Sequence, residues 1–228
     1  METQNLSFLQ WLAQFMISGG IFMWVILAVW VVGIAVAIER YKAYKNYYVD
    51  GTSFMDQVRK FVLNNQISDA IQYCSESKSL LSHVLKNGLK RAGAPKDQVL
   101  DALESTILEV VPQVEKRLAM VSLMSNVSTL FGLLGTIQGL IDSFSAVAGA
   151  DAAEKAKLLA MGISVAMNTT ALGLVSAISL MFVHSWLSGR AENMINQIEE
   201  NSVKLIDIFG AKKAYQSQNI QNENNKAA

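Results

Sequence analysis

Residues 126–140 read Asn126-Val-Ser-Thr-Leu-Phe-Gly-Leu-Leu-Gly-Thr-Ile-Gln-Gly-Leu140, and residues 162–178 read Gly162-Ile-Ser-Val-Ala-Met-Asn-Thr-Thr-Ala-Leu-Gly-Leu-Val-Ser-Ala-Ile178. Both segments are uncharged and lie within stretches long enough to cross a membrane. Both repeat Gly, Ser, Thr and Ala at helical spacing. Because small residues let membrane helices approach closely, these segments predict spans that pack on other helices.

The distribution of charge sets the number of spans. No Asp, Glu, Lys or Arg occurs in three long stretches, residues 3–38, 118–141 and 158–189. An apolar helix of about 20 residues crosses a bilayer. The sequence therefore predicts an all-α membrane protein with three transmembrane helices, at residues 17–38, 118–147 and 158–187.

Lysine and arginine predict the orientation of the spans. Arg40, Lys42 and Lys45 follow the first span, Lys116 and Arg117 precede the second, and Arg190 follows the third. By the positive-inside rule, these ends face the cytoplasm. The N-terminus is then periplasmic and the C-terminus cytoplasmic. The segments between the spans are predicted as an interfacial helix at 1–16, a cytoplasmic helical domain at 39–117, a periplasmic loop at 148–157, a cytoplasmic helix at 188–210 and a disordered tail at 211–228.

Residues 39–117 carry short amphipathic helical patterns, which predict a small bundle under the membrane. Its last helix is expected to be kinked at Pro112 and to run straight into the second span. Cys74 is expected to be a small buried apolar residue. In the 188–210 helix, apolar positions form a face for a partner helix: Ile195, Ile198, Ser202, Leu205 and Phe209.

A helical wheel shows how the small residues are arranged in the two segments. At about 100° per residue, one face of the second span collects small and hydroxylated side chains. They are Ser125, Ser128, Thr129, Gly132, Gly135, Thr136, Gly139 and Ser143. The third span has a similar face, with Thr170 at its edge: Gly162, Ala166, Thr169, Gly173, Ser176 and Ala177. The glycines Gly132, Gly135, Gly139, Gly162 and Gly173 are expected to allow helix packing.

Two interpretations of the hydroxyl groups are open. They can bond the carbonyl four residues earlier and simply pack, or they can line an ion path, because each hydroxyl both donates and accepts a hydrogen bond. The candidates for the path are Ser128, Thr129, Thr136, Thr169 and Thr170. No acidic residue lies mid-membrane, although proton paths usually need one. Asp142, near the outer end of the second span, either attracts cations to an entrance or is simply solvated there.

The two segments resemble the MotA/TolQ/ExbB proton channel family, in its TolQ/ExbB-like branch. Gly132-Leu-Leu-Gly-Thr136-Ile-Gln-Gly139 is similar to the family's G-L-x-G-T-x-x-G element. Thr170-Ala-Leu-Gly173-Leu174, with Ala177-Ile178, is similar to its T-A-x-G-L-x-x-A-I element. The chain departs from ExbB and TolQ at Val165, where they have an acid, and at Ser179, where they have Pro.

The resemblance implies a homo-oligomeric ring of about five copies around a single-span dimer of the ExbD/TolR type, whose membrane Asp carries the proton. It places Thr136 and Thr170 in the pore. It further implies a bacterial inner-membrane motor that uses the proton motive force and works with a TonB/TolA-like force transmitter. No enzymatic activity, cofactor or metal is expected, and a net charge of zero gives no sign of nucleic-acid binding. Two alternatives stay open, a Na⁺-driven motor of the same architecture and a non-conducting membrane scaffold.

Overall fold

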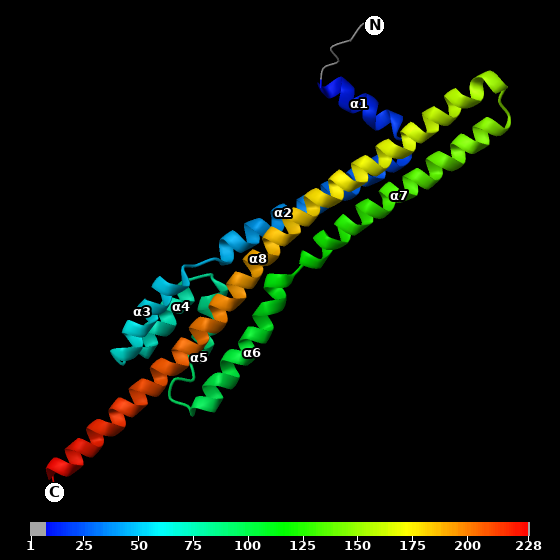
Figure 1. The fold of residues 1–228 in the computed structure, drawn as a ribbon. Helices are drawn as coiled ribbons and strands as arrows, with labels where there is room; N and C mark the ends of the chain where they lie inside the picture. Colours follow the sequence, from blue (N-terminus) through cyan, green and yellow to red (C-terminus); the bar gives the residue numbers. More distant parts are fainter. Residues whose placement is uncertain (1–7, 228) are drawn as a thin grey trace. The chain divides into compact units, whose positions relative to one another are not determined.

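A computed structural model describes residues 8–227, with side chains described for residues 10, 13–17, 19–151 and 153–211, and all the regular secondary structure of the described residues is helical. Figure 1 labels the helices in chain order. They are α1 (Phe8–Ser18), α2 (Ile21–Tyr47), α3 (Gly51–Leu63), α4 (Ile67–Glu76), α5 (Leu80–Leu89), α6 (Lys96–Glu115), α7 (Leu118–Ala148) and α8 (Ala152–Ala227).

Three helical stretches among the described residues are long and apolar enough to cross a membrane. They include α2, α7 and the first part of α8, so the prediction of an all-helical protein with three candidate spans is confirmed. The first of these helices begins at Ile21 rather than at residue 17. Gly20 has φ +73, a left-handed conformation that favours glycine, and it separates α1 from α2.

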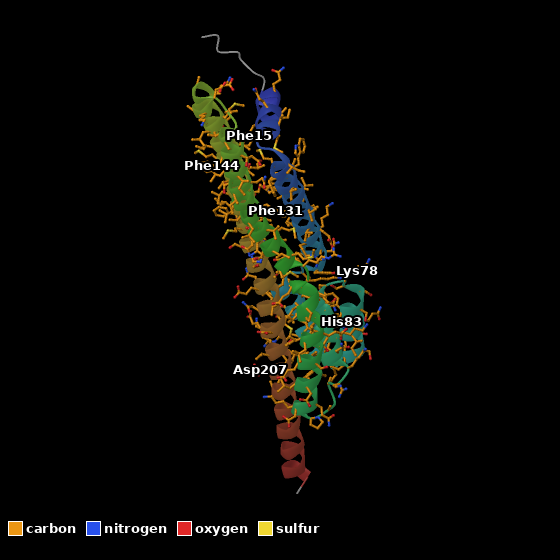
Figure 2. The ribbon with its side chains drawn as sticks, turned by 90° about the vertical axis from the view of Figure 1, so that its right-hand side faces the viewer. Phe15, Lys78, His83, Phe131, Phe144 and Asp207 are labelled. Atoms are coloured by element: carbon orange, nitrogen blue, oxygen red, sulfur yellow. The ribbon has the colours of Figure 1, made fainter. Side chains whose placement is uncertain are left out.

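The chain divides into two compact units. The first consists of the described parts of residues 1–40 and 117–187, and the second of those of residues 41–116 and 188–228. In the first unit, α7 and the start of α8 form an antiparallel hairpin (Figure 1). The exposed apolar side chains of this hairpin, Phe144 among them, stand out along it in Figure 2.

In the second unit, α3, α4, α5 and α6 pack successively on one another. The core consists of large aliphatic side chains such as Leu85, Leu89 and Leu103. The later part of α8 joins this core, since a Cβ on Gly88 would lie 3.0 Å from Leu205 Cδ2. The middle of the apolar face predicted for residues 188–210 is therefore covered within the chain, because Ile198, Ser202 and Leu205 are all buried. Ile195 and Phe209, at its ends, are half-buried.

Two boundaries differ from the expectation. Residues 96–148 do not form one helix, because α6 ends at Glu115 and Arg117 takes a left-handed conformation (φ 64, ψ 2) before α7 begins. The polar composition after Gly210 predicts a disordered tail, whereas α8 continues as a helix to Ala227. A helix that is already formed extends readily into polar residues, since the costly step is nucleation.

Candidate ion-path site

The small faces of α7 and α8 meet each other within one chain. A Cβ on Gly173 would lie 2.8 Å from the Cα of Gly132, which leaves no room for a side chain at this crossing. Further along, a Cβ on Gly135 would lie 2.2 Å from Thr169 Cγ2, and one on Gly139 would lie 3.1 Å from Ala166 Cβ. We call this contact the glycine seam. It extends to a fourth crossing, where a Cβ on Gly162 would overlap Ser143.

The hydroxyl groups inside the glycine seam bond to backbone carbonyls. Ser128 and Thr169 are completely buried, and they donate to Met124 O at 2.9 Å and Val165 O at 2.8 Å. Thr169 Oγ1 also lies 3.1 Å from Gly19 O, just before α2. Ser125 donates across the seam to Ala177 O at 2.8 Å. In this arrangement, Ser128 bonds within α7 and Thr169 also bonds the residue before α2, and neither buried hydroxyl faces a path along the hairpin.

The other three candidate hydroxyls lie at one edge of the hairpin. Thr129 is exposed and Thr136 and Thr170 are half-buried. Relative to Gly132, Thr129 and Thr136 are rotated by about +60° and +40°, and Thr170 is rotated by about +80° relative to Gly162. Because α7 and α8 are antiparallel and face each other, rotations of the same sign point to the same side. We call Thr129, Thr136 and Thr170 the threonine edge.

Helix α2 covers the opposite edge of the hairpin. A Cβ on Gly33 would lie 2.8 Å from Leu180 Cδ2 and 3.3 Å from Met124 Cβ. Met124 is rotated by about −80° from Gly132, the opposite sense to Thr129 and Thr136. Helix α2 thus closes one edge of the hairpin and, among the described side chains, leaves the threonine edge uncovered.

The geometry of each hydroxyl on the threonine edge is compatible with contact to an ion or a proton carrier. Thr136 donates to Leu133 O at 2.6 Å, and Thr170 lies 3.1 Å from Gly132 O across the seam. Thr129 makes a longer contact to Ser125 O, at 3.4 Å. A hydroxyl that donates to a carbonyl keeps its own lone pairs as acceptors. Each oxygen can therefore accept a hydrogen bond from water or from a protonated carboxyl group.

Asp142 lies apart from these threonines on the wheel of α7. It is exposed, and its Oδ1 accepts a hydrogen bond of 2.9 Å from Gln138 Nε2 one turn earlier. The carboxylate is about −80° from Gly132, on the other side of the helix from Thr129 and Thr136. The structure therefore does not bring Asp142 together with the threonine edge.

One hydrogen bond between α2 and α8 was not identified from the sequence. Trp30 Nε1 donates to Ser179 Oγ at 2.8 Å, and Ser179 in turn donates to Ser176 O. The sequence offered a signal at Ser179, which departs from the pattern of the family that the chain resembles. It gave no sign of the partner, because the facing residue depends on the rotation of α2 against the hairpin.

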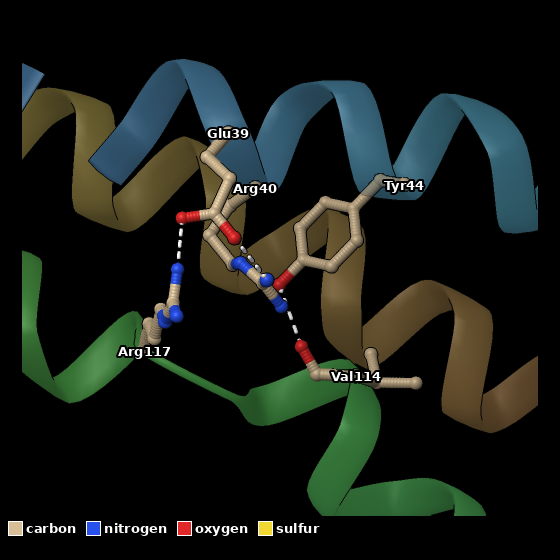
Figure 3. A network of polar contacts seen from close by, with 5 residues as sticks. All are labelled: Glu39, Arg40, Tyr44, Val114 and Arg117. Atoms are coloured by element: carbon tan, nitrogen blue, oxygen red, sulfur yellow. Dashed lines mark hydrogen bonds and ion pairs between the residues drawn. The ribbon is translucent and has the colours of Figure 1, made fainter. Parts of the chain in front are cut away.

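An ion-pair cluster at the end of the first unit was also missed. Glu39 Oε1 lies 2.9 Å from Arg40 Nη2, and its other oxygen accepts from Arg117, as Figure 3 shows. The hydrogen bond from Arg40, together with that from Arg117, holds the pKa of the Glu39 carboxyl below its ordinary value. Two guanidinium groups share this one carboxylate, so the cluster keeps a net positive charge. It lies where the uncharged part of α2 ends and α7 begins.

Comparison with known proteins identifies the family. The model of the MotA/TolQ/ExbB proton channel family matches residues 76–200, more than half of the 228-residue chain and including both small-residue segments. The chain belongs to this family. The family is one of membrane proton channels in energy-transducing systems. With its three apolar helices, this member of the MotA/TolQ/ExbB family is a multi-pass inner-membrane protein.

Several relatives are similar to this MotA/TolQ/ExbB member. An ExbB homolog from Methanothermobacter thermautotrophicus is 28% identical over 183 residues, which are 80% of this chain and 64% of the relative. The TolQ protein of the Tol-Pal system from Haemophilus influenzae is 33% identical over 99 residues, 43% of this chain and 41% of the relative. Biopolymer transport protein exbB1 from Vibrio cholerae is 35% identical over 99 residues, 43% of each chain. The chain thus spans less than two thirds of the length of each of these three relatives.

Proposed function

We propose that the chain is the channel and stator subunit of an ExbB/TolQ-like motor. The motor couples the proton motive force to mechanical work through a single-span partner of the ExbD/TolR type. About five copies of this chain surround a dimer of the partner, and a TonB/TolA-like protein transmits the force outward. The N-terminus faces the periplasm, and residues 39–117 and the end of α8 face the cytoplasm.

The uncovered threonine edge carries this proposal. It presents three hydroxyl oxygens on a hairpin whose spans contain no carboxylate between residues 118 and 141 or between 158 and 189. A carboxyl group in the membrane must therefore come from another chain if protons are to cross. A protonated Asp of the partner would donate a hydrogen bond to a threonine oxygen and release its proton when it leaves that site. One charge that crosses about 100 mV yields about 2.3 kcal/mol, so work requires repeated cycles.

Thr136 offers the sharpest test of this function. The Thr136 hydroxyl donates to Leu133 O of its own helix. The Thr170 hydroxyl also donates across the glycine seam, to Gly132 O. Thr136→Val keeps the β-branched shape and removes the hydroxyl, and Thr136→Ser keeps the hydroxyl and removes a methyl group. We expect the Val variant to lose proton flux in proteoliposomes that contain the chain and its single-span partner, while the complex still assembles. The Ser variant should keep part of the flux.

A control in the second unit uses Thr106, whose hydroxyl donates to Ala102 O of its own helix at 2.7 Å and accepts from Asn87 Nδ2 at 3.2 Å. Thr106→Val should leave the flux intact. Full flux in a Thr136→Val, Thr170→Val double variant would remove the threonine edge from the ion path. An ion flux that depends on the Na⁺ concentration at fixed pH and fixed membrane potential would favour the sodium-driven alternative. A complex that shows no ion flux under either a proton or a sodium gradient would favour the non-conducting scaffold.

A further inference from the structure

The last turns of α2, with the residue that follows them, present an aromatic and basic face to the outside of the second unit. Tyr41 and Tyr48 are 50% and 57% exposed, and Lys42 and Lys45 are also exposed. Tyr41, Lys45 and Tyr48 follow the i, i+4, i+7 spacing, so they share one side of the helix. We call Tyr41, Lys42, Lys45 and Tyr48 the collar.

The rotation of the collar is fixed by Tyr44, which lies about 60° from Tyr41 and about 100° from Lys45 around α2. Tyr44 is 5% exposed, and its hydroxyl donates a buried hydrogen bond of 2.9 Å to Val114 O of α6 (Figure 3). A buried tyrosine hydroxyl that lost this partner would pay a desolvation cost of about 1–3 kcal/mol. The contact therefore holds Tyr44 inward and keeps Lys45 and its neighbours outward.

The collar is positively charged and has no acid within it. Between Glu39 and Asp50 the sequence contains Arg40, Lys42 and Lys45 and no Asp or Glu. Neither lysine has an ion pair with a carboxylate of the described residues, whose pairs involve Arg40, Arg117 and Lys204. The ammonium groups are thus available for an anion from outside the chain.

The position of the collar along α2 indicates where that anion lies. Helix α2 is uncharged from Ile21 to Ile38, which spans roughly 27 Å and matches a hydrocarbon core of about 30 Å. Lys42 and Lys45 follow about 6 and 10 Å further along the axis. A lysine side chain bends back along a helix to keep its charge at the headgroup level, and tyrosine also favours this level.

We propose that the collar binds the headgroups of anionic phospholipids in the leaflet at the charged end of α2. The phosphate groups pair with Lys42 and Lys45, while the rings of Tyr41 and Tyr48 lie among the headgroups. This binding does not depend on ion conduction. It anchors the junction at which α2 leaves the membrane.

Native mass spectrometry of the full chain tests this proposal. The protein is reconstituted in nanodiscs of equal parts phosphatidylglycerol and phosphatidylcholine, released, and its retained lipids are counted. The wild type should retain phosphatidylglycerol over phosphatidylcholine. Each lysine near a membrane surface contributes a factor of about five in affinity, so Lys42→Gln and Lys45→Gln should each lower the enrichment about five-fold.

Two double variants serve as controls. Lys42→Arg with Lys45→Arg keeps the charge and should keep the enrichment, which also shows that the face tolerates substitution. Lys60→Gln with Lys90→Gln removes two exposed lysines elsewhere in the same unit and should leave the enrichment unchanged. Equal retention of both lipids by the wild type would overturn the proposal. So would an unchanged enrichment in Lys42→Gln with Lys45→Gln, or an equal loss in the control at residues 60 and 90.

Discussion

The glycine seam of α7 and α8 and the core of the second unit are both helix packings, but they are made from different side chains. At the seam, Gly132 and Gly173 bring two backbones into contact. In the second unit, Leu85, Leu103 and Leu205 fill the space between the helices. The hydrophobic effect drives the burial of the leucines. In the membrane this effect is absent between helices, because lipid is as apolar as the spans, and the helices associate through close van der Waals packing of small residues. We therefore expect added side-chain volume to disrupt the helix packing at the seam, and removed side-chain volume to destabilise the core of the second unit.

The largest effect is expected from added volume at the seam. In Gly173→Leu, the side chain would meet the backbone of Gly132 and Ser128, which cannot move aside as a flexible side chain would. Overpacking commonly costs about 1–3 kcal/mol even for small insertions, and a leucine here exceeds that range. We expect the membrane hairpin not to form, measured as loss of the folded chain in detergent by size-exclusion chromatography and thermal melting.

Gly189 supplies the matched control in the same helix. A Cβ on Gly189 meets nothing within 4 Å, so Gly189→Leu should fold normally. If Gly173→Leu melts at the wild-type temperature, the glycine seam is not the contact that holds α7 against α8.

Removing volume from the core of the second unit should give the next largest effect. Leu103 is 1% exposed, and Leu103→Ala should cost about 2–5 kcal/mol, since it deletes buried methyl groups and leaves a cavity. Leu108 lies on the same helix but is 75% exposed, so Leu108→Ala should change stability by about 0.5 kcal/mol or less. Chemical unfolding of both variants checks the difference. Equal losses in the two variants would contradict the assigned inner face of α6.

The smallest effect concerns Cys74, which is buried in the second unit. Burial raises the pKa of the Cys74 thiol to about 12, so the folded chain keeps it protonated at neutral pH. Alkylation by iodoacetamide at pH 8 should be slow in the folded protein and fast after denaturation. The unfolded chain loses this proton at lower pH than the folded chain. The thiol therefore lowers stability as pH rises above its ordinary pKa towards 12, and Cys74→Ala should remove that part of the pH dependence.

The sequence predicted the three candidate spans and most of the buried face of α7, because both depend on local composition. Uncharged length located the spans, and the wheel separated buried positions such as Ser125 from exposed ones such as Leu130. What the two small faces contact was not predictable, since a small residue fits equally against the same chain or another copy. The structure uses them within the chain, so a substitution such as Gly135→Leu is expected to act on folding before it acts on assembly.

Other features depend on tertiary structure, which local sequence patterns do not predict. The break at Arg117 has no glycine, and Pro112 lies within α6 instead of ending it. The bond from Trp30 to Ser179 requires the rotation of α2 to be known. The separation of Thr136 from Ser128 likewise needed the contact with α8, because both hydroxyls lie on the same face of the wheel.

Thiol accessibility tests the central distinction between the glycine seam and the threonine edge most directly. In a Cys74→Ser background, single cysteines replace Thr136 at the edge and Ser128 within the seam. A small cationic methanethiosulfonate reagent is then applied to the chain in membranes. We expect Thr136→Cys to react readily and Ser128→Cys to remain unreacted, because the second side chain is fully buried. Faster reaction at Ser128→Cys than at Thr136→Cys would place the ion path along the seam and contradict the account.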